Sequence, residues 1–415
     1  MRTVSFLTIA LLGGLTAAPG SADCVFVNMN RIPNQVQAFR VGSGGALAEV
    51  TGSPFLTEGG NGGLGLATAG GYLYAVNTFL PNGARITGGG GLSGSVSGFT
   101  IAADCTLALL PDSPWFTEGT DPHSAAANPA GTRLFVGNLT GGTIKTFDIA
   151  VDGSLSIDIA PSASQPSPAD LGVSPDGAHL FVSHGDAGLG VYDVALDGTL
   201  TAAAGSPFAS GGPPLFQGNR LAPGGGRFYA ADNANAQIAG FTVGAGGALS
   251  PLPGSPYTTG SGPADLVLSP RGFLFASNSL GSTLGGFAVA GDGSLAPVPG
   301  SPFAASSPDG LAINPNGSFL YTLGHTATGF FQLDVSAVSA AGALTPVAGS
   351  PFAPDTAGGA SRLVYYPQIV VVLAELPTLS PLALGILAAL LTLGAFAILK
   401  RRAPQHERTG RARPD

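Results

Sequence analysis

A Pro-x-Gly turn recurs along this chain at nearly constant intervals, and that period limits the folds open to it. The turn stands at residues 129–131, 175–177, 223–225, 270–272 and 315–317, with spacings of 46, 48, 47 and 45 residues. A repeat of this length is typical of a β-propeller, in which each unit folds as one four-stranded blade. The repeat therefore predicts a closed ring of similar sheets.

Each unit contains the same succession of strand and turn signals. Short apolar strands flank the Pro-x-Gly turn, an alternating strand follows, and an Asp-Gly pair then marks a tight hairpin. The unit ends in Gly-Ser-Pro-aromatic, at 52–55, 205–208, 254–257, 300–303 and 349–352, with 112–115 as a variant. Second strands are predicted at 24–27, 72–76, 134–136, 180–182, 228–230, 274–276 and 319–321, which gives seven blades.

The first unit lacks an inner strand, and a β-rich segment at 361–366 is left over after the last unit. We expect this segment to complete blade 1, because that pairing closes the ring and removes two exposed sheet edges. The fold class is therefore all-β, a seven-bladed propeller over residues 23–367. Residues 85–94, rich in Gly, form the most irregular loop.

Composition agrees with this class and excludes one kind of partner. The chain has 65 Gly and 34 Pro, as many tight turns require, and only 10% charged residues. Between residues 23 and 375 there are 9 basic and 22 acidic residues, a net charge of −13. An acidic domain without a basic stripe argues against nucleic acid as a partner.

Both ends of the chain have the features of targeting segments. Residues 1–22 combine Arg2, a short apolar run and small residues, which predicts a secretory signal peptide. Residues 379–399 have no charge and are long enough for a transmembrane helix. A basic cluster begins at Lys400, so the tail 400–415 is predicted to be cytoplasmic and the propeller to lie outside the cytoplasm.

The C-terminal 40 residues resemble the IPTL-type sorting signal of Gram-negative bacteria. Leu376-Pro377-Thr378-Leu379 in the linker 368–378, the apolar span and the basic cluster give the tripartite pattern. The resemblance implies a cell-envelope location, inner-membrane anchoring at least for a time, and sorting or processing machinery as a partner.

Residues 24–366 resemble the lactonase-type seven-bladed propellers, relatives of 6-phosphogluconolactonases and of YVTN-repeat proteins. The best match is Asp121-Pro122-His123-Ser124, followed by Asn128-Pro129 and an apolar strand at 134–136. Lactonase-type enzymes also have an Arg-His pair in the analogous strand of a neighbouring blade. Here that position reads Ala169-Asp170.

Several polar residues are predicted to meet at the mouth of the central channel. They stand five or six residues before the turn proline, where the inner strand starts, and comprise His123, Asp170, Asp265 and Asp309. Arg220 interrupts an otherwise apolar inner strand in blade 5. His184 belongs to a second ring, at the ends of the second strands, and is a further ligand-binding candidate.

Two functions fit these residues. The first is an envelope-anchored propeller that presents a binding surface to a protein, a glycan or a small ligand. The second is a lactone hydrolase outside the cytoplasm, in which His123 is the base, Arg220 stabilises the oxyanion and Asp170 or Asp265 orients the imidazole. Export and the acidic domain make a phosphorylated sugar an unsuitable substrate. No metal or cofactor motif occurs, so neither is predicted.

The two cysteines predict one disulfide. Export permits the bond, and Cys24 starts the second strand of blade 1. Cys105 takes the Gly position of the blade 2 hairpin, which lies on the same face of the neighbouring blade. A Cα separation above ~7 Å would rule the bond out.

Overall fold

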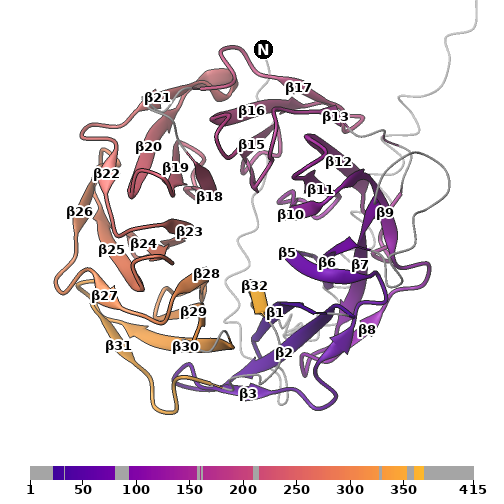
Figure 1. Cartoon of the computed structure of the whole chain (residues 1–415), viewed down its shortest axis with the longest axis horizontal. Coiled ribbons are helices and arrows are strands. Elements are labelled where there is room, and N and C mark those ends of the chain that lie inside the picture. Colours follow the sequence, from indigo (N-terminus) through magenta and orange to yellow (C-terminus); the bar gives the residue numbers. More distant parts are fainter. Residues whose placement is uncertain are drawn as a thin grey trace, which may run out of the picture. The chain divides into compact units, whose positions relative to one another are not determined.

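The computed structural model describes residues 22–31, 33–79, 93–156, 159, 162–208, 215–326, 330–352 and 359–368. These residues form seven antiparallel sheets around one axis, and the predicted seven-bladed propeller is confirmed (Figure 1). Residues 1–21 of the predicted signal peptide, most of the 85–94 loop and everything after Gln368 lie outside the described residues. Among the described residues, no helix has the length and hydropathy needed to cross a membrane.

Blades 2 to 7 follow one another along the chain, and each runs from an inner to an outer strand. Blade 2 has β5 (Asn61–Ala69), β6 (Tyr72–Phe79), β7 (Ser93–Ile101), β8 (Leu107–Leu109) and β9 (Trp115–Thr120). Blade 3 has β10 (Pro122–Ala127), β11 (Arg133–Asn138), β12 (Thr143–Asp148) and β13 (Ser162–Ala163). Blade 4 has β14 (Asp170–Val173), β15 (His179–Ser183), β16 (Leu189–Val194) and β17 (Leu200–Ala202).

The later blades repeat this order. Blade 5 has β18 (Phe216–Leu221), β19 (Arg227–Asp232), β20 (Gln237–Val243), the 3₁₀ turn η1 (Ala245–Gly247), β21 (Leu249–Pro251) and β22 (Tyr257–Thr258). Blade 6 has β23 (Pro263–Ser269), β24 (Phe273–Asn278), β25 (Thr283–Val289), β26 (Leu295–Pro297) and β27 (Phe303–Ala304). Blade 7 has β28 (Pro308–Ile313), β29 (Phe319–His325), β30 (Phe331–Val338) and β31 (Leu344–Pro346).

Blade 1 is assembled from both ends of the described chain, as the sequence predicts. Its strands are β1 (Cys24–Asn30), β2 (Gln35–Val41), β3 (Leu47–Glu49) and β4 (Phe55–Leu56), and its inner strand is β32 (Gly359–Tyr366). β32 pairs with β1 in antiparallel register, with Cys24 opposite Tyr366 and Val27 opposite Leu363. The inner strands β5, β10, β18, β23, β28 and β32 surround the axis in Figure 1.

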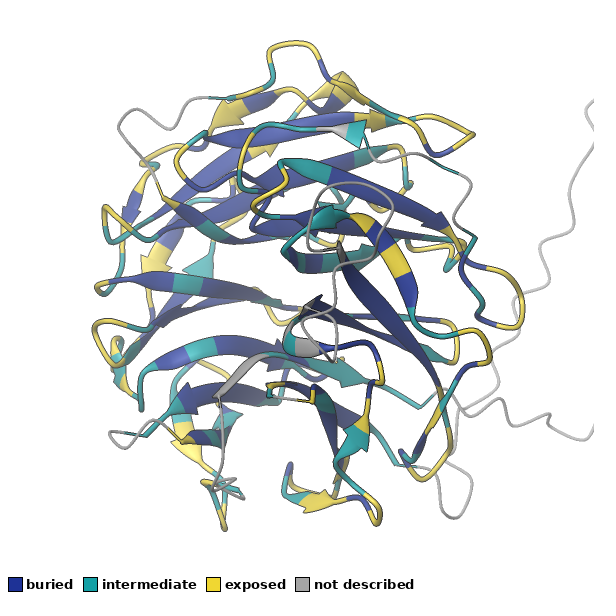
Figure 2. Cartoon of the chain, turned by 45° about the vertical axis from the view of Figure 1, so that its right-hand side comes forward, coloured by how far each residue is buried: buried dark blue, intermediate teal, exposed yellow. Residues whose placement is uncertain are grey.

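The apolar core lies between neighbouring blades rather than at the axis. Phe181 of blade 4 and Phe228 of blade 5 pack with ring centroids 5.2 Å apart, and both are fully buried. The second and third strands of each blade supply most of these buried side chains. Figure 2 shows the buried residues in dark blue along the strands. The inner strands also contribute polar residues, among them Asp170, Arg220 and Asp265, so a polar site can form at the axis.

The Gly-Ser-Pro-aromatic motif fixes the outer edge of a blade. Its serine hydroxyl accepts a hydrogen bond from a backbone N–H of the third strand, as between Ser255 and Gly240 (2.9 Å). The same bond forms in six blades, always across fifteen residues, with Ser53, Ser113, Ser206, Ser255, Ser301 and Ser350. All six Ser–Pro bonds are cis.

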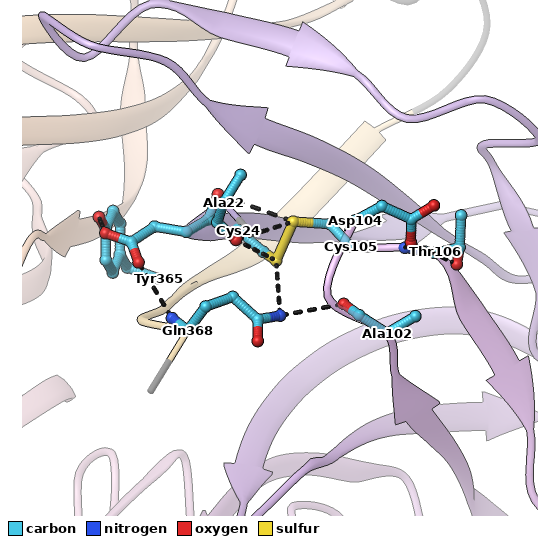
Figure 3. The surroundings of a disulfide bond; sticks show 9 residues. Ala22, Cys24, Ala102, Asp104, Cys105, Thr106, Tyr365 and Gln368 are labelled. Atoms are coloured by element: carbon cyan, nitrogen blue, oxygen red, sulfur yellow. Dashed lines mark hydrogen bonds between the residues drawn. A yellow bond between two sulfur atoms is a disulfide. The ribbon is translucent and has the colours of Figure 1, made fainter. Parts of the chain in front are cut away.

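The predicted disulfide is confirmed. Cys24 and Cys105 are bonded, with their Cα atoms 5.7 Å apart, and both are fully buried. The C-terminal end of β32 lies beside the bond, where Gln368 Nε2 contacts Cys24 Sγ (3.6 Å) and donates to the Ala102 carbonyl (3.0 Å) (Figure 3). The disulfide therefore holds blades 1 and 2 together at the point where the ring closes.

Candidate functional site

The inner strands of three blades share a register that brings particular side chains to the channel mouth. Pro122, Pro263 and Pro308 each pair with the last or next-to-last residue of the second strand, and a β-bulge follows each pair. His123 of blade 3 and Asp309 of blade 7 therefore occupy the same level of the ring. Asp265 stands one residue further in, and Asp170 occupies the matching place in blade 4.

Below this level, two aspartates and two arginines form a layer of ion pairs across the channel. Arg220 joins Asp170 (3.1 Å) and Asp265 (2.8 Å), which belong to the blades on either side of it. Arg362 approaches the same two carboxylates, at 3.8 Å from Asp170 and 3.3 Å from Asp265. The predicted residues Asp170, Arg220 and Asp265 are thus in mutual contact, and Arg220 points into the channel.

Both carboxylates in this layer also bind the backbone of the next blade. The Asn219 N–H donates to Asp170 (2.8 Å). In the same way, the Leu311 N–H donates to Asp265 (2.9 Å). The Asp265 side chain is only 2% exposed and that of Asp170 11%, so both are saturated by partners and largely withdrawn from solvent. These contacts join neighbouring blades. They leave the two carboxylates little capacity for further hydrogen bonds to a ligand.

Arg362 is the functional candidate that the sequence analysis missed. It belongs to the closing strand β32 and lies opposite Asn28 of β1, so only the closed ring brings it into the channel. Burial lowers the pKa of Arg362, but Asp170, Asp265 and Asp309 outweigh burial and hold the pKa above its usual value. The sequence feature that could have identified Arg362 is that it is a lone arginine in the β-rich segment left over after the last repeat.

His123 is a half-buried neutral base at the mouth. Its Nδ1 lies 3.1 Å from the Ala169 carbonyl oxygen, and because a carbonyl only accepts, Nδ1 bears the proton. Burial lowers the pKa of His123, and the charge of Arg362 lowers it further, against smaller opposing effects of Ala169, Asp121 and Asp170. Among the described residues Nε2 has no hydrogen-bond partner, so its lone pair is available. A backbone carbonyl thus orients the imidazole, in place of the carboxylate of Asp170 or Asp265 that we expected.

Asp309 forms a different pair at the same level. His325, the last residue of β29, donates from Nε2 to Asp309 Oδ2 (2.9 Å). The side chains are 26% and 37% exposed, respectively. Asp309 is therefore the most accessible of the three predicted carboxylates. It lies close enough to Arg362 for its charge to raise the pKa of Arg362.

The position of His184 does not support the prediction that it binds a ligand. It is fully buried, and its Nε2 lies 3.1 Å from the Tyr192 hydroxyl. Burial lowers the pKa of His184 to about 4, so it stays neutral within the sheet. Its repeat position holds a polar side chain, Asn in several other blades, and in the structure His184 packs between strands at this position.

A cavity of about 450 Å³ runs along the channel from the ion-pair layer. Asp170, Arg220, Asp265 and Arg362 line it together with Ser124 and with apolar residues of the inner strands, such as Val267 and Leu311. In the part of the chain that the structure describes, no cluster of three His, Cys, Asp or Glu side chains could hold a metal ion. The cavity therefore contains two paired arginines, and His123, one residue before Ser124 in β10, lies at the level of the mouth next to it.

The model of the family described as Lactonase, 7-bladed beta-propeller, matches residues 63–348, which is more than half of the chain. The chain belongs to this family. The lactonase resemblance inferred from Pro122-His123 is confirmed at the family level, while the IPTL-type signal stays a prediction. The sequence has no significant match among the curated proteins.

Solved structures share the fold of this lactonase-family propeller at low identity. A candidate 6-phosphogluconolactonase from Bacteroides uniformis has a TM-score of 0.66 at 20% identity, over 83% of this chain and 99% of its own. The periplasmic gluconolactonase of Pseudomonas aeruginosa has a TM-score of 0.66 at 20% identity, over 84% of this chain and 99% of its own. At this identity the likeness concerns the fold.

Proposed function

We propose that this protein is a lactone hydrolase that acts at the mouth of its central channel. The main support is the state of His123, which combines a fixed Nδ1–H tautomer, a pKa lowered by burial and by the charge of Arg362, and an Nε2 without a hydrogen-bond partner among the described residues. A neutral imidazole with an available lone pair is what general-base activation of water requires. Membership of the lactonase family points to the same class of reaction.

The chemistry needs three groups, which the mouth supplies. Water attacks the lactone carbonyl carbon as His123 Nε2 takes its proton. The carbonyl oxygen gains negative charge, which the guanidinium N–H groups of Arg362 and Arg220 stabilise. The ring C–O bond then breaks, and the departing oxygen takes the proton back from His123, which gives a hydroxy acid and restores the base.

The proposed site of action is the cell envelope. The predicted signal peptide and the tripartite C-terminal segment support export and anchoring, with sorting or processing machinery as the partner. The Cys24–Cys105 bond agrees with an oxidising compartment. Next to the two arginines, a cavity of about 450 Å³ offers room for a small lactone.

A lactone-hydrolysis assay on the purified full-length protein tests the proposal, with His123→Gln as the main variant. Glutamine can still donate to the Ala169 carbonyl but cannot accept a proton, so kcat/KM should fall by about 10²-fold or more. His179→Gln is the matched control, because His179 pairs with Asp193 (2.9 Å) and takes no part in the ion-pair layer. Unchanged activity in His123→Gln would contradict the proposed base.

A second candidate is the binding propeller without catalysis. The observation in its favour is that both channel arginines are already paired with carboxylates, which are themselves bound by backbone N–H groups. If the protein hydrolyses no lactone yet binds one, with weaker binding in His123→Gln, this second function is the correct one.

A further inference from the structure

We propose that Asp309, held in place by His325, selects uncharged lactones by excluding anionic ones at the channel mouth. This inference rests on the proposed hydrolase function and names the substrate class of the same site. It assigns a specificity role to Asp309 and brings in His325 as a positioning residue.

The geometry sets Asp309 apart from the other two carboxylates. Asp170 and Asp265 form ion pairs with two arginines and accept hydrogen bonds from backbone N–H groups of the next blade. The Asp309 side chain is 37% exposed, and the His325 Nε2–H donates a hydrogen bond to it. The imidazole thus holds Oδ2 of Asp309 in place. The rest of the carboxylate is accessible to a ligand at the channel mouth.

Asp309 also lies at the channel mouth. It shares its register with His123, the proposed base, on the opposite arc of the ring. Its charge acts on Arg362, which also acts on His123. A lactone whose carbonyl lies between His123 and Arg362 therefore lies within the electrostatic reach of Asp309.

The balance of charge around the channel disfavours an anion. Among the described residues, three carboxylates (Asp170, Asp265, Asp309) stand against two guanidinium groups, His123 is neutral, and His325 binds Asp309 as a hydrogen-bond donor. A phosphate dianion needs positive charge that is not already neutralised. The charges of Arg220 and Arg362 are offset by Asp170 and Asp265, and no lysine is among the described residues that line the channel. A carboxylate in contact with hydroxyl groups, by contrast, suits a polyhydroxylated neutral substrate as a hydrogen-bond acceptor.

The experiment compares kcat/KM for gluconolactone and for its 6-phosphate ester in the full-length protein. The wild type should prefer the uncharged lactone. Asp309→Asn keeps the size of the side chain and removes its charge, so the ratio of phosphorylated to uncharged kcat/KM should rise by about tenfold, in line with unit charges separated by several ångströms near a surface.

Asp193→Asn is the matched control, because Asp193 is also an aspartate paired with a histidine at 2.9 Å, but in another part of the fold. It changes the net charge by the same amount and should leave the ratio unaltered. His325→Ala removes the donor and so frees the Asp309 carboxylate without removing it. We expect the preference for the uncharged lactone to persist there, with a raised KM for that substrate.

The outcomes separate the two proposals. If the wild type hydrolyses no lactone, the proposed function fails and this inference fails with it. If both lactones react equally well, or if Asp309→Asn leaves the ratio unchanged, the inference alone is overturned. Should Asp309→Asn not fold, ionic strength gives the answer in the wild type, because added salt screens the repulsion and must raise kcat/KM for the phosphorylated lactone selectively. The absence of that salt effect also overturns the inference.

Discussion

His123 and His184 occupy repeat positions of the same kind of strand pair, yet their surroundings give them opposite uses. His184 is fully buried and fills space between strands, whereas His123 is half-buried and presents Nε2 to the channel mouth. Burial lowers the pKa of both. The chain alone reveals that each is a histidine near a strand end, but exposure depends on how the neighbouring blade packs.

The pH dependence of the reaction should follow His123. Because its pKa lies below the ordinary histidine value of ~6.5, the base stays neutral and active below that pH, and kcat/KM falls only as the pH drops through the lowered pKa. Stopped-assay rates from pH 4 to 8 measure this limb. In His123→Gln the residual rate should no longer fall with acid in this way. An acid limb at or above pH 6.5 in the wild type would contradict the lowered pKa of His123.

His184 should make stability, rather than activity, sensitive to acid. Its pKa is about 4 in the fold against 6.5 in the unfolded chain, so the unfolded chain binds the proton more tightly. The contribution of neutral His184 to the free energy of unfolding is fully present above pH 6.5. It is lost as the pH falls toward 4, by about 3 kcal/mol over that range.

Urea unfolding at pH 7 and pH 4.5 measures the effect of His184. Asparagine occupies the equivalent position in several blades, as Asn138 and Asn278 show, so His184→Asn is the matched variant. It should unfold with a smaller loss of free energy on acidification than the wild type. An equal loss in both proteins would assign the acid sensitivity to other groups.

At the scale of the element, the closing strand β32 has two tasks. It supplies the inner strand of blade 1 and also contributes Arg362 to the channel. The repeat predicts the strand, because one unit lacks an inner strand and one segment is left over. It does not predict the arginine's contacts, because these depend on Asp170 and Asp265 in blades on the far side of the ring. The register of β32 also shifts opposite Asn28 and Met29.

The same division holds for the rest of the site. Asp170 and Asp265 were found from the period, because residues at one repeat position meet when the ring closes, and Arg220 was found as a charge within an apolar inner strand. The Asp309–His325 pair was not, because it joins two strands through side chains whose orientation the period does not determine. Period and turn chemistry thus predict where strands lie, whereas individual side-chain partners require the packed blades.

Removing the Arg362 charge should destabilise the ring and alter the base. In Arg362→Met, the nearly buried Asp265 and Asp170 keep Arg220 but lose their second cation, at a cost of about 2 to 4 kcal/mol in the free energy of unfolding. Loss of the same charge should raise the pKa of His123, because Arg362 lowers it in the wild type. Denaturant unfolding and the acid limb of kcat/KM measure the two effects. A destabilised variant with an unshifted limb would mean that Arg362 acts only in packing.

Over the whole molecule, each blade is fastened to the next by contacts at the hairpin between its third and fourth strands. Arg133 of blade 3 donates to the Ala195 carbonyl in the blade 4 hairpin (2.6 Å). Tyr229 of blade 5 donates to the Gly293 carbonyl in the blade 6 hairpin (2.7 Å). Between blades 1 and 2 the equivalent fastening is the covalent Cys24–Cys105 bond.

The disulfide replaces a hydrogen bond at the junction where the ring is least secure. Blade 1 depends on β32, whose C-terminal end is bound by Asp23: the Gln368 N–H donates to its carboxylate (3.0 Å), and so does the Tyr365 hydroxyl. Asp23 directly precedes Cys24, so the bond also fixes the residue that holds the closing strand. Loss of the bond should therefore weaken ring closure as well as the contact between blades 1 and 2.

Reduction of the disulfide should thus lower the free energy of unfolding substantially. The bond joins residues 81 apart, and loop-closure entropy for such a span corresponds to about 4 kcal/mol. The double variant Cys24→Ala/Cys105→Gly should be insensitive to reductant. It should also exceed the reduced wild type in stability by about 1 kcal/mol, because Cys105 adopts φ 69°, the left-handed conformation that glycine takes in the hairpins of other blades at no steric cost. Denaturant unfolding of both proteins with and without dithiothreitol makes the comparison. If reduction leaves the wild type unchanged, the hydrogen bonds of Asp23 and the pairing of β32 with β1 suffice to keep the ring closed.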